Sequence, residues 1–178
     1  MSLYCPHGFD CDPTYSRGYF YKSVIPVPKY RFDLNPLCSG VVCADAQCLP
    51  MPAACISSMI LDPPFLPGKQ GLKGRMRERF SELGQFQSMD FLYRVYAGMI
   101  REAYRVLDRA GIMIFKCQDY TSQIFYPTHI KVYEYATEVG FKAVDLFILL
   151  AKSRIIRTDQ QQQHARKFHS YFWVFQKQ

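Results

Sequence analysis

Four short apolar segments in the first third of the chain each end at an aspartate, and this pattern limits what the chain can fold into. The segments are residues 9–12, 29–33, 41–44 and 56–61, which end at or just before Asp12, Asp33, Asp45 and Asp62. The carboxyl ends of parallel strands meet at one edge of a sheet, so strands in that arrangement would gather these acidic residues there. The gaps between the segments are too short for full helices, and we therefore expect one face of the sheet to be thinly covered.

The second half of the chain alternates helical and strand patterns. Apolar residues recur at helical spacing over 89–107 and 129–139, and a glycine follows each stretch closely. Further strands are expected at 112–116, 143–152 and 171–175. This alternation predicts a single α/β domain over residues 1–178 with a mostly parallel sheet. No helical pattern separates the last two strands, so we expect them to pair antiparallel at an edge.

Two stretches rich in lysine and arginine interrupt these elements and are expected to be loops, at about 66–87 and 153–169. The formal net charge of +7 favours a polyanionic partner, because neutralising phosphates drives nucleic-acid binding. The candidate nucleic-acid contacts are Lys69, Lys73, Arg75, Arg77, Arg154, Arg157, Arg166 and Lys167. A merely solvated surface would explain the same charges equally well.

Neither a membrane span nor a metal site is expected. No apolar run approaches the ~20 residues needed to cross a bilayer. The seven cysteines never form the CxxC pair that is typical of zinc sites. Reduced thiols are usual in the cytoplasm, which is the predicted location.

The most specific motif is Asp62-Pro63-Pro64-Phe65, directly after an apolar segment. An exocyclic amine is a poor nucleophile, because its lone pair is delocalised into the ring. The Asp62 carboxylate and the Pro63 carbonyl can accept its two hydrogens and favour a pyramidal nitrogen aimed at a methyl donor. Both prolines stiffen the turn, and Phe65 can stack on a base turned out of its strand. A proline-stiffened turn after a core strand is the alternative explanation.

This motif resembles the Asp-Pro-Pro-aromatic signature of class I S-adenosylmethionine-dependent amino-methyltransferases of the DNA methylase type, and the likeness extends along the chain. Residues 12–18 resemble a degenerate form of the glycine-rich first motif, and 102–115 and 163–175 resemble later parts of small phage and bacterial members. The resemblance implies a seven-stranded, Rossmann-like sheet with an antiparallel last strand. It also implies S-adenosylmethionine as methyl donor and an exocyclic amino group of DNA or RNA as acceptor, N6 of adenine foremost.

The resemblance also implies a set of cofactor-binding residues. These are Asp12, Thr14 and Gly18 in the first motif, Asp33 for the ribose hydroxyls, and Asp45 with Ala46 for the adenine. Each aspartate is also of a type that ordinary turns favour. The first motif departs from the family pattern, because Ser16 stands where glycine is common. Lys116 and Asp119 follow the fifth strand and are expected at the same edge, in structural or substrate-contacting roles.

Two functions from different classes remain open. The first is the methyltransferase that acts on a base. The second is a catalytically weak, methyltransferase-like subunit that binds nucleic acid or a partner protein, favoured by the degenerate first motif and the lack of a separate target-recognition domain. In either case a protein partner could supply target recognition.

Overall fold

The computed structural model describes residues 3–22, 25–65, 88–151, 165 and 167–178. Its strands are β1 (Cys11–Asp12), β2 (Tyr30–Asp33), β3 (Val42–Cys43), β4 (Ile56–Leu61), β5 (Leu107–Cys117), β6 (Tyr120–Thr121), β7 (Phe125–Tyr126), β8 (Phe141–Leu150) and β9 (His169–Lys177). Its helices are the 3-10 turn η1 (Tyr19–Tyr21), α2 (Met89–Val106) and α3 (Thr128–Val139).

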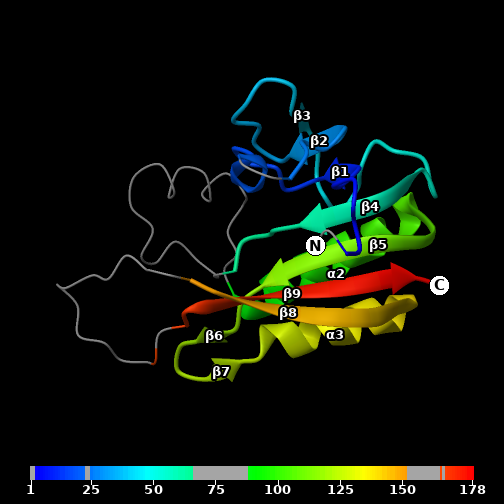
Figure 1. Cartoon of the computed structure of the whole chain (residues 1–178). Helices are drawn as coiled ribbons and strands as arrows, with labels where there is room; N and C mark the ends of the chain where they lie inside the picture. Colours follow the sequence, from blue (N-terminus) through cyan, green and yellow to red (C-terminus); the bar gives the residue numbers. More distant parts are fainter. Residues whose placement is uncertain (1–2, 23–24, 66–87, 152–164, 166) are drawn as a thin grey trace.

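Seven of these strands form one sheet in the order β3-β2-β1-β4-β5-β9-β8, and β6 and β7 form a separate hairpin (Figure 1). The first five strands pair in parallel, and β9 runs antiparallel to both of its neighbours. The predicted α/β sheet with an antiparallel last strand is therefore confirmed. The last two strands do pair at an edge, with β8 outermost and β9 against β5.

The two faces of the sheet are covered differently, as the short gaps between the first strands predicted. Met59 and Leu61 of β4 pack in one core cluster with side chains of α2 and α3, which lie together behind the sheet in Figure 1. Ile60, which points the other way, packs with Phe9, Tyr21 and other aromatic side chains. Within the described residues no α-helix covers this second face, and the N-terminal segment and η1 take that place.

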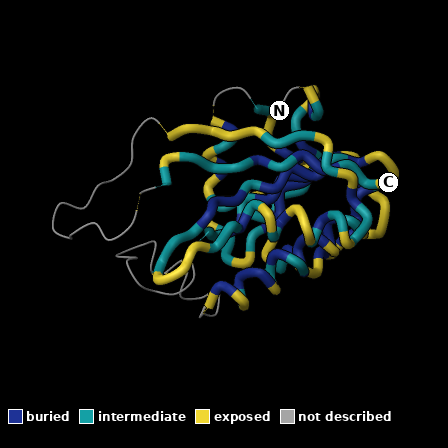
Figure 2. Tube along the Cα trace, turned by 90° about the horizontal axis from the view of Figure 1, so that it is seen from below, coloured by how far each residue is buried: buried dark blue, intermediate teal, exposed yellow. Residues whose placement is uncertain are grey.

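Buried positions are concentrated in the central strands and on the inward sides of the helices (Figure 2). Helix α2 is capped by the preceding Ser88, whose side chain accepts a hydrogen bond from Phe91 N at 3.2 Å, a usual N-terminal cap. Its buried residues Leu92, Tyr96 and Ile100 recur at helical spacing. Helix α3 ends at Gly140, whose φ of 112° is a left-handed conformation that glycine adopts without strain.

Several predicted boundaries were wrong. Strand β5 begins at Leu107 rather than 112, because α2 passes directly into it, and its pairing with β4 shifts register before residue 112. Strands β1 and β3 are two residues long, whereas 9–12 and 41–44 were expected. Strand β8 occupies 141–150 instead of 143–152, and β9 extends over 169–177. The β6–β7 hairpin was not predicted, since its strands are too short to show an alternating pattern.

A buried carboxylate fastens the loop after β3 to the end of α2. Glu102 Oε1 accepts hydrogen bonds from Leu49 N and from Arg105 Nη2, both at 2.6 Å. Arg105 also donates to Leu49 O at 3.2 Å. The hydrogen bond from Arg105 lowers the pKa of Glu102, so the carboxylate is ionised at neutral pH. This anchor holds the segment that follows Asp45.

Replacing Glu102 with Gln should lower the free energy of unfolding by about 1–3 kcal/mol at pH 7, because a charged hydrogen-bond acceptor is lost in a buried position. A carboxyl whose pKa is lowered on folding stabilises the fold above its ordinary pKa and loses that contribution as the pH falls through the folded value. The difference between wild type and E102Q, measured by urea unfolding, should therefore shrink from pH 7 to pH 3. E134Q is the matched control, because Glu134 pairs with Lys131 on the exposed surface of α3 and should change stability little. An equal loss in both variants would contradict the anchor role.

Candidate active site

The aspartates at the ends of the first three strands make the same local hydrogen bond. Asp12 Oδ1 accepts from Thr14 N at 2.8 Å, and Asp33 Oδ1 accepts from Asn35 N at 2.9 Å. Asp45 Oδ1 accepts from Gln47 N at 2.8 Å. Each carboxylate thus stabilises the turn that follows its own strand, as aspartate often does. This role is compatible with ligand binding, since a carboxylate offers about four acceptor positions.

Asp12 is the most deeply buried of these carboxylates, with 2% of its surface exposed. Its Oδ1 also accepts from the Thr14 hydroxyl at 3.0 Å, and its Oδ2 accepts from the Tyr21 hydroxyl at 2.7 Å. Burial raises the pKa of Asp12 to about 7, although the hydrogen bonds from Tyr21 and Thr14 oppose the rise. The hydrogen bonds described for Asp12 are to Thr14 and Tyr21 of the same chain. Its contact with a cofactor stays a prediction.

The turn after β1 has the shape that glycine usually provides. Ser16 has a φ of 58° and Gly18 a φ of 64°, both in the left-handed region. Ser16 N donates to Asp33 Oδ2 at 2.7 Å, which ties the turn to the end of β2. A Cβ on Gly18 would lie 2.5 Å from the hydroxyl of Tyr15, whose ring stacks on Tyr21. The turn therefore needs glycine at 18 and tolerates serine at 16 at a cost in strain.

Asp62 differs from the other three because neither of the two residues that follow it can donate a backbone hydrogen bond. Pro63 and Pro64 have no backbone N–H to donate. Its Oδ2 instead accepts from Lys116 Nζ at 3.0 Å, across from the end of β4 to the end of β5. Asp62 N donates to the Thr14 hydroxyl at 2.8 Å, and the Pro64 carbonyl accepts from the Tyr96 hydroxyl. The proline turn is thus held from both sides.

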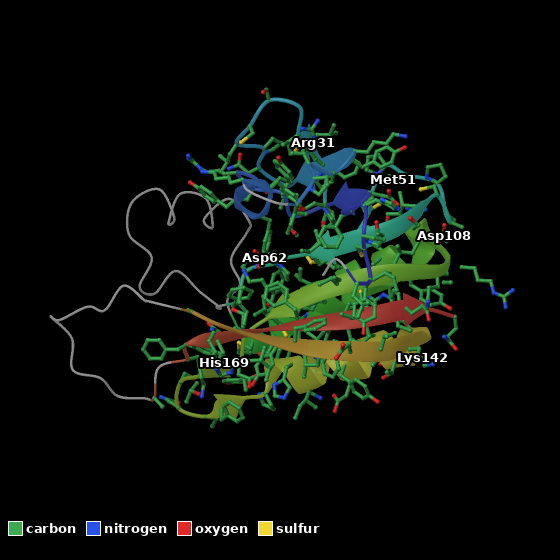
Figure 3. The ribbon with its side chains drawn as sticks, viewed as in Figure 1. Arg31, Met51, Asp62, Asp108, Lys142 and His169 are labelled. Atoms are coloured by element: carbon green, nitrogen blue, oxygen red, sulfur yellow. The ribbon has the colours of Figure 1, made fainter. Side chains whose placement is uncertain are left out.

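The structure brings part of the predicted site together. Thr14 joins Asp12 to Asp62, and Ser16 joins the same turn to Asp33. Asp45 and the buried Ala46 follow β3, at the far side of β2, and are linked through Leu49 to the Glu102 anchor. Asp62 lies at the carboxyl end of the central strands, opposite to Asp108 (Figure 3).

The predicted nucleic-acid contacts fall largely outside the described residues. These are Lys69, Lys73, Arg75, Arg77, Arg154, Arg157 and Arg166. Lys167 is described, and its Nζ lies 5.0 Å from the centre of the Phe125 ring on the β6–β7 hairpin. Lys167 is therefore next to an exposed aromatic side chain close to the carboxyl end of β5.

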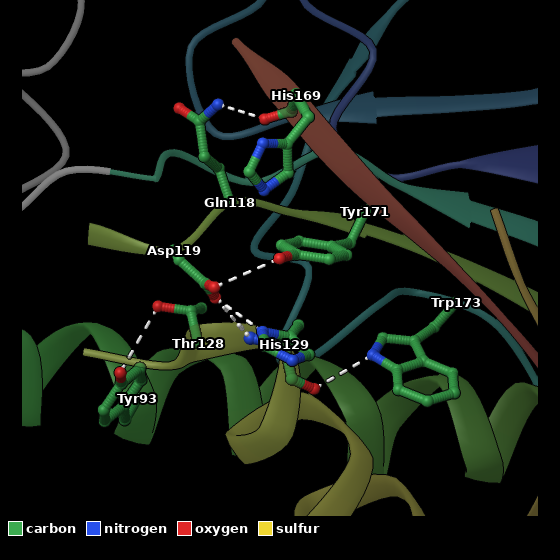
Figure 4. A network of polar contacts seen from close by, with 8 residues as sticks. All are labelled: Tyr93, Gln118, Asp119, Thr128, His129, His169, Tyr171 and Trp173. Carbon is green, nitrogen blue, oxygen red and sulfur yellow. Dashed lines mark hydrogen bonds and ion pairs between the residues drawn. The ribbon is translucent and has the colours of Figure 1, made fainter. Parts of the chain in front are cut away.

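A second polar cluster, centred on Asp119, follows β5 (Figure 4). The buried Asp119 accepts from His129 Nδ1 at 2.7 Å and from His129 N at 3.2 Å at the start of α3. Tyr171 donates its hydroxyl to Asp119 at 3.3 Å and stacks on the His129 ring. Trp173 donates to the carbonyl of His129 at 2.9 Å. The cluster fixes α3 against β9, and the expected structural role of Asp119 fits these contacts. The residues that pair with it, His129 and Tyr171, gave no signal in the sequence.

Among the described residues, no group of three or more histidine, cysteine, aspartate or glutamate side chains is placed to hold a metal ion. None of their helices is both long and apolar enough to cross a membrane.

The strand order and the row of aspartates at the carboxyl edge define a class I methyltransferase fold. Solved structures with this fold resemble the chain. One is a proposed DNA modification methylase from Thermus thermophilus, in complex with S-adenosyl-L-methionine, with a TM-score of 0.53, 16% identity, and coverage of 75% of this chain and 53% of the methylase. Another is the cytosine-N4-specific PvuII DNA methyltransferase, with a TM-score of 0.51, 14% identity and coverage of 72% and 45%.

A smaller protein covers the chain more completely. A proposed methyltransferase from Bacillus halodurans C-125 has a TM-score of 0.52 and 12% identity, with coverage of 94% of this chain and 90% of that protein. The chain therefore spans about half the length of the two DNA methylases and nearly all of the smaller protein. No protein-family model and no curated protein sequence matches the chain. At these identities the likeness establishes the shared fold.

Asp12 should make the stability of the protein depend on pH. Because folding raises the pKa of Asp12 to about 7, its ionised form is disfavoured in the folded state. The contribution of Asp12 to the free energy of unfolding should therefore be fully present near pH 4. It should be lost as the pH rises through 7, a change of about 2–4 kcal/mol. D12N cannot ionise and should remove this part of the pH dependence, measured by urea unfolding between pH 4 and 8. Parallel curves for wild type and D12N would show that Asp12 ionises normally in the folded protein.

Replacing Ser16 with Gly should raise the free energy of unfolding by about 0.5–1 kcal/mol, because glycine relieves the left-handed strain but loses more chain entropy on folding. Urea unfolding at pH 7 measures the change. S16A keeps the strain and should give no gain, and an S16G protein no more stable than S16A would contradict the strained turn.

Proposed function

We propose that this protein transfers a methyl group from S-adenosylmethionine to an exocyclic amino group of a nucleic-acid base. The observation that carries the proposal is the proline turn that begins at Asp62, at the carboxyl edge of the sheet. Neither proline has a backbone N–H to donate to the Asp62 carboxylate, and hydrogen bonds with Thr14 and Tyr96 hold the turn on either side. We infer that the Asp62 carboxylate and the Pro63 carbonyl form a pair of acceptors for an amine that presents two hydrogens and a lone pair.

The residues at the neighbouring strand ends fit the cofactor. The Asp33 carboxylate accepts from the backbone N–H groups of Ser16 and Asn35, which leaves acceptor positions for the two ribose hydroxyls. Asp45 and Ala46, fixed by the Glu102 anchor, would face the adenine ring. The resemblance in fold to a methylase complexed with S-adenosyl-L-methionine supports this assignment. The cofactor supplies a methyl group activated by a sulfonium.

The reaction itself needs only positioning and charge stabilisation from this chain. Asp62 and the Pro63 carbonyl accept the two amino hydrogens, and the nitrogen lone pair is turned towards the methyl group. Positive charge that develops on the nitrogen, as its bond to the methyl carbon forms and the methyl–sulfur bond breaks, is stabilised by the Asp62 carboxylate. The methylated nitrogen then releases one proton to solvent. Phe65 would stack on the base and hold its plane.

For the base, we propose N6 of adenine, from the resemblance of the Asp-Pro-Pro-Phe motif. N4 of cytosine presents the same chemistry, and a cytosine-N4-specific enzyme shares the fold. Nucleic acid as substrate is supported by the net charge of +7 and by Lys167 beside the exposed Phe125 ring.

The second candidate function is a methyltransferase-like subunit that binds nucleic acid without methylating it. The observation that favours it is the first motif, where Ser16 is strained and the Asp12 carboxylate is buried under internal hydrogen bonds.

Titration calorimetry with S-adenosylmethionine and S-adenosylhomocysteine separates the two functions. Wild type should bind both, and D33N should bind roughly 10–100-fold more weakly, because hydrogen bonds to a charged acceptor contribute about 1.5–3 kcal/mol. D108N, at the opposite end of the strands, should bind like wild type. A wild-type protein that binds neither molecule would leave only the subunit.

Methyl transfer to adenine- and cytosine-containing oligonucleotides, followed with radiolabelled cofactor, tests Asp62. D62N should lower kcat roughly 10²–10³-fold, the loss typical of removing one preorganised electrostatic contact, and leave cofactor binding within about threefold. Unchanged kcat in D62N would overturn the assigned role of the motif, and the labelled base would distinguish N6 from N4.

A further inference from the structure

One cation is already present in the proposed amine site. Lys116 Nζ pairs with Asp62 and lies 5.1 Å from the ring centres of both Phe20 and Phe65 and 5.9 Å from that of Phe172. We call these three rings and the carboxylate the amine box. They come from three separate parts of the chain: η1, the proline turn after β4, which holds both Asp62 and Phe65, and β9.

The chemistry of the amine box is that of a site for organic cations. Aromatic faces attract an ammonium group through their quadrupole, and a carboxylate at the same place adds a full opposite charge. The side chain of Lys116 is 18% exposed and that of Asp62 is 27% exposed, so water screens the pair only in part. The protein thus places its own ammonium where such a cation would bind.

We propose that Lys116 determines which amines the site accepts, by occupying the amine box and so excluding substrates that carry a positive charge. The inference rests on the proposed function, because it takes the Asp62–Phe65 turn to be the amine site. A second ammonium, fully charged before any reaction, would meet the like charge of Lys116 beside the one carboxylate of the box, with which Lys116 already pairs. A neutral amino group can donate to the same carboxylate without displacing Lys116, because a carboxylate accepts several hydrogen bonds.

The charge of Lys116 limits which amines can serve as methyl acceptors. Aliphatic amines are protonated at neutral pH, whereas the amino groups of bases are neutral because their lone pairs are delocalised into the ring. Both kinds of amine can donate a hydrogen bond to a carboxylate. Lys116 selects the neutral aromatic ones by charge, and the site is therefore suited to bases rather than to lysine side chains or small biogenic amines.

The experiment removes the Lys116 ammonium by mutation and measures the binding of an added organic cation. Tetramethylammonium is the probe, and its binding is measured by saturation-transfer NMR with no cofactor present. Wild type should bind it weakly, and K116M should bind it at least about tenfold more tightly, because the box is emptied of its own ammonium. K116R keeps the charge and should behave like wild type. The double variant K116M/D62N should lose the gain.

Lys131 provides the matched control. It also pairs with a carboxylate, that of Glu134, but both side chains are exposed and the pair lies on the surface of α3, away from the amine box. K131M should bind the probe like wild type, so a gain shared by K131M and K116M would overturn the proposal. K116Q serves as a second neutral variant if K116M does not fold, and thermal unfolding checks both. A folded K116M or K116Q with no gain in affinity also overturns it.

The outcome can be told apart from a failure of the proposed function, because the probe needs neither cofactor nor methyl transfer. Suppose that wild type methylates oligonucleotides and that folded K116M gains no affinity for the probe. This result refutes the charge filter and leaves the proposed function standing. If K116M gains affinity for the probe but wild type transfers no methyl group, the amine box is supported as a charge-selective site and the proposed methyl transfer is refuted. In an active enzyme, tetramethylammonium should inhibit K116M and not wild type.

Discussion

The hydroxyl of Thr14 joins the two halves of the candidate site. It donates to the buried carboxylate of Asp12 and accepts from the backbone of Asp62, so the turn after β1 and the turn after β4 cannot move independently. The strands themselves are adjacent but short, and β1 is only two residues long. A two-residue strand cannot fix the position of the turn after β4 by itself. The hydrogen bond between the Thr14 hydroxyl and the backbone of Asp62 therefore helps to fix where Asp62 lies.

Most of the fold could be predicted because it follows from patterns along the chain. The helices at 89–106 and 128–139 have clear apolar spacing, and Ser88 and Gly140 mark a beginning and an end. The mostly parallel sheet was predicted from the alternation of helical and strand patterns. Boundaries were less accurate where two elements join without a loop, as at Leu107, since no turn residue marks that change.

The sequence placed the candidate residues at the ends of successive strands, but their contacts could not be predicted. The spacing of Asp62 and Lys116 along the chain says nothing of their pairing, which depends on the register of β4 against β5. The hydrogen bond that the Tyr21 hydroxyl donates to the buried Asp12 carboxylate has no signal in the sequence either. The Asp119 cluster depends on contacts between β5, α3 and β9 that only the three-dimensional arrangement provides.

The two explanations offered for the strand-end aspartates, turn formation and ligand binding, are not alternatives. The first three carboxylates each take a hydrogen bond from the residue two positions on, and this bond fixes the turn while leaving acceptor capacity. Only at Asp62 is that bond impossible, since the residue two positions on is a proline. Among the described residues, Lys116 of β5 donates to this fourth carboxylate. A carboxylate accepts several hydrogen bonds, so an incoming amino group can donate to Asp62 while Lys116 stays in place. The proline motif thus removes the turn-forming hydrogen bond at one strand end, and the proposed chemistry takes place at that strand end.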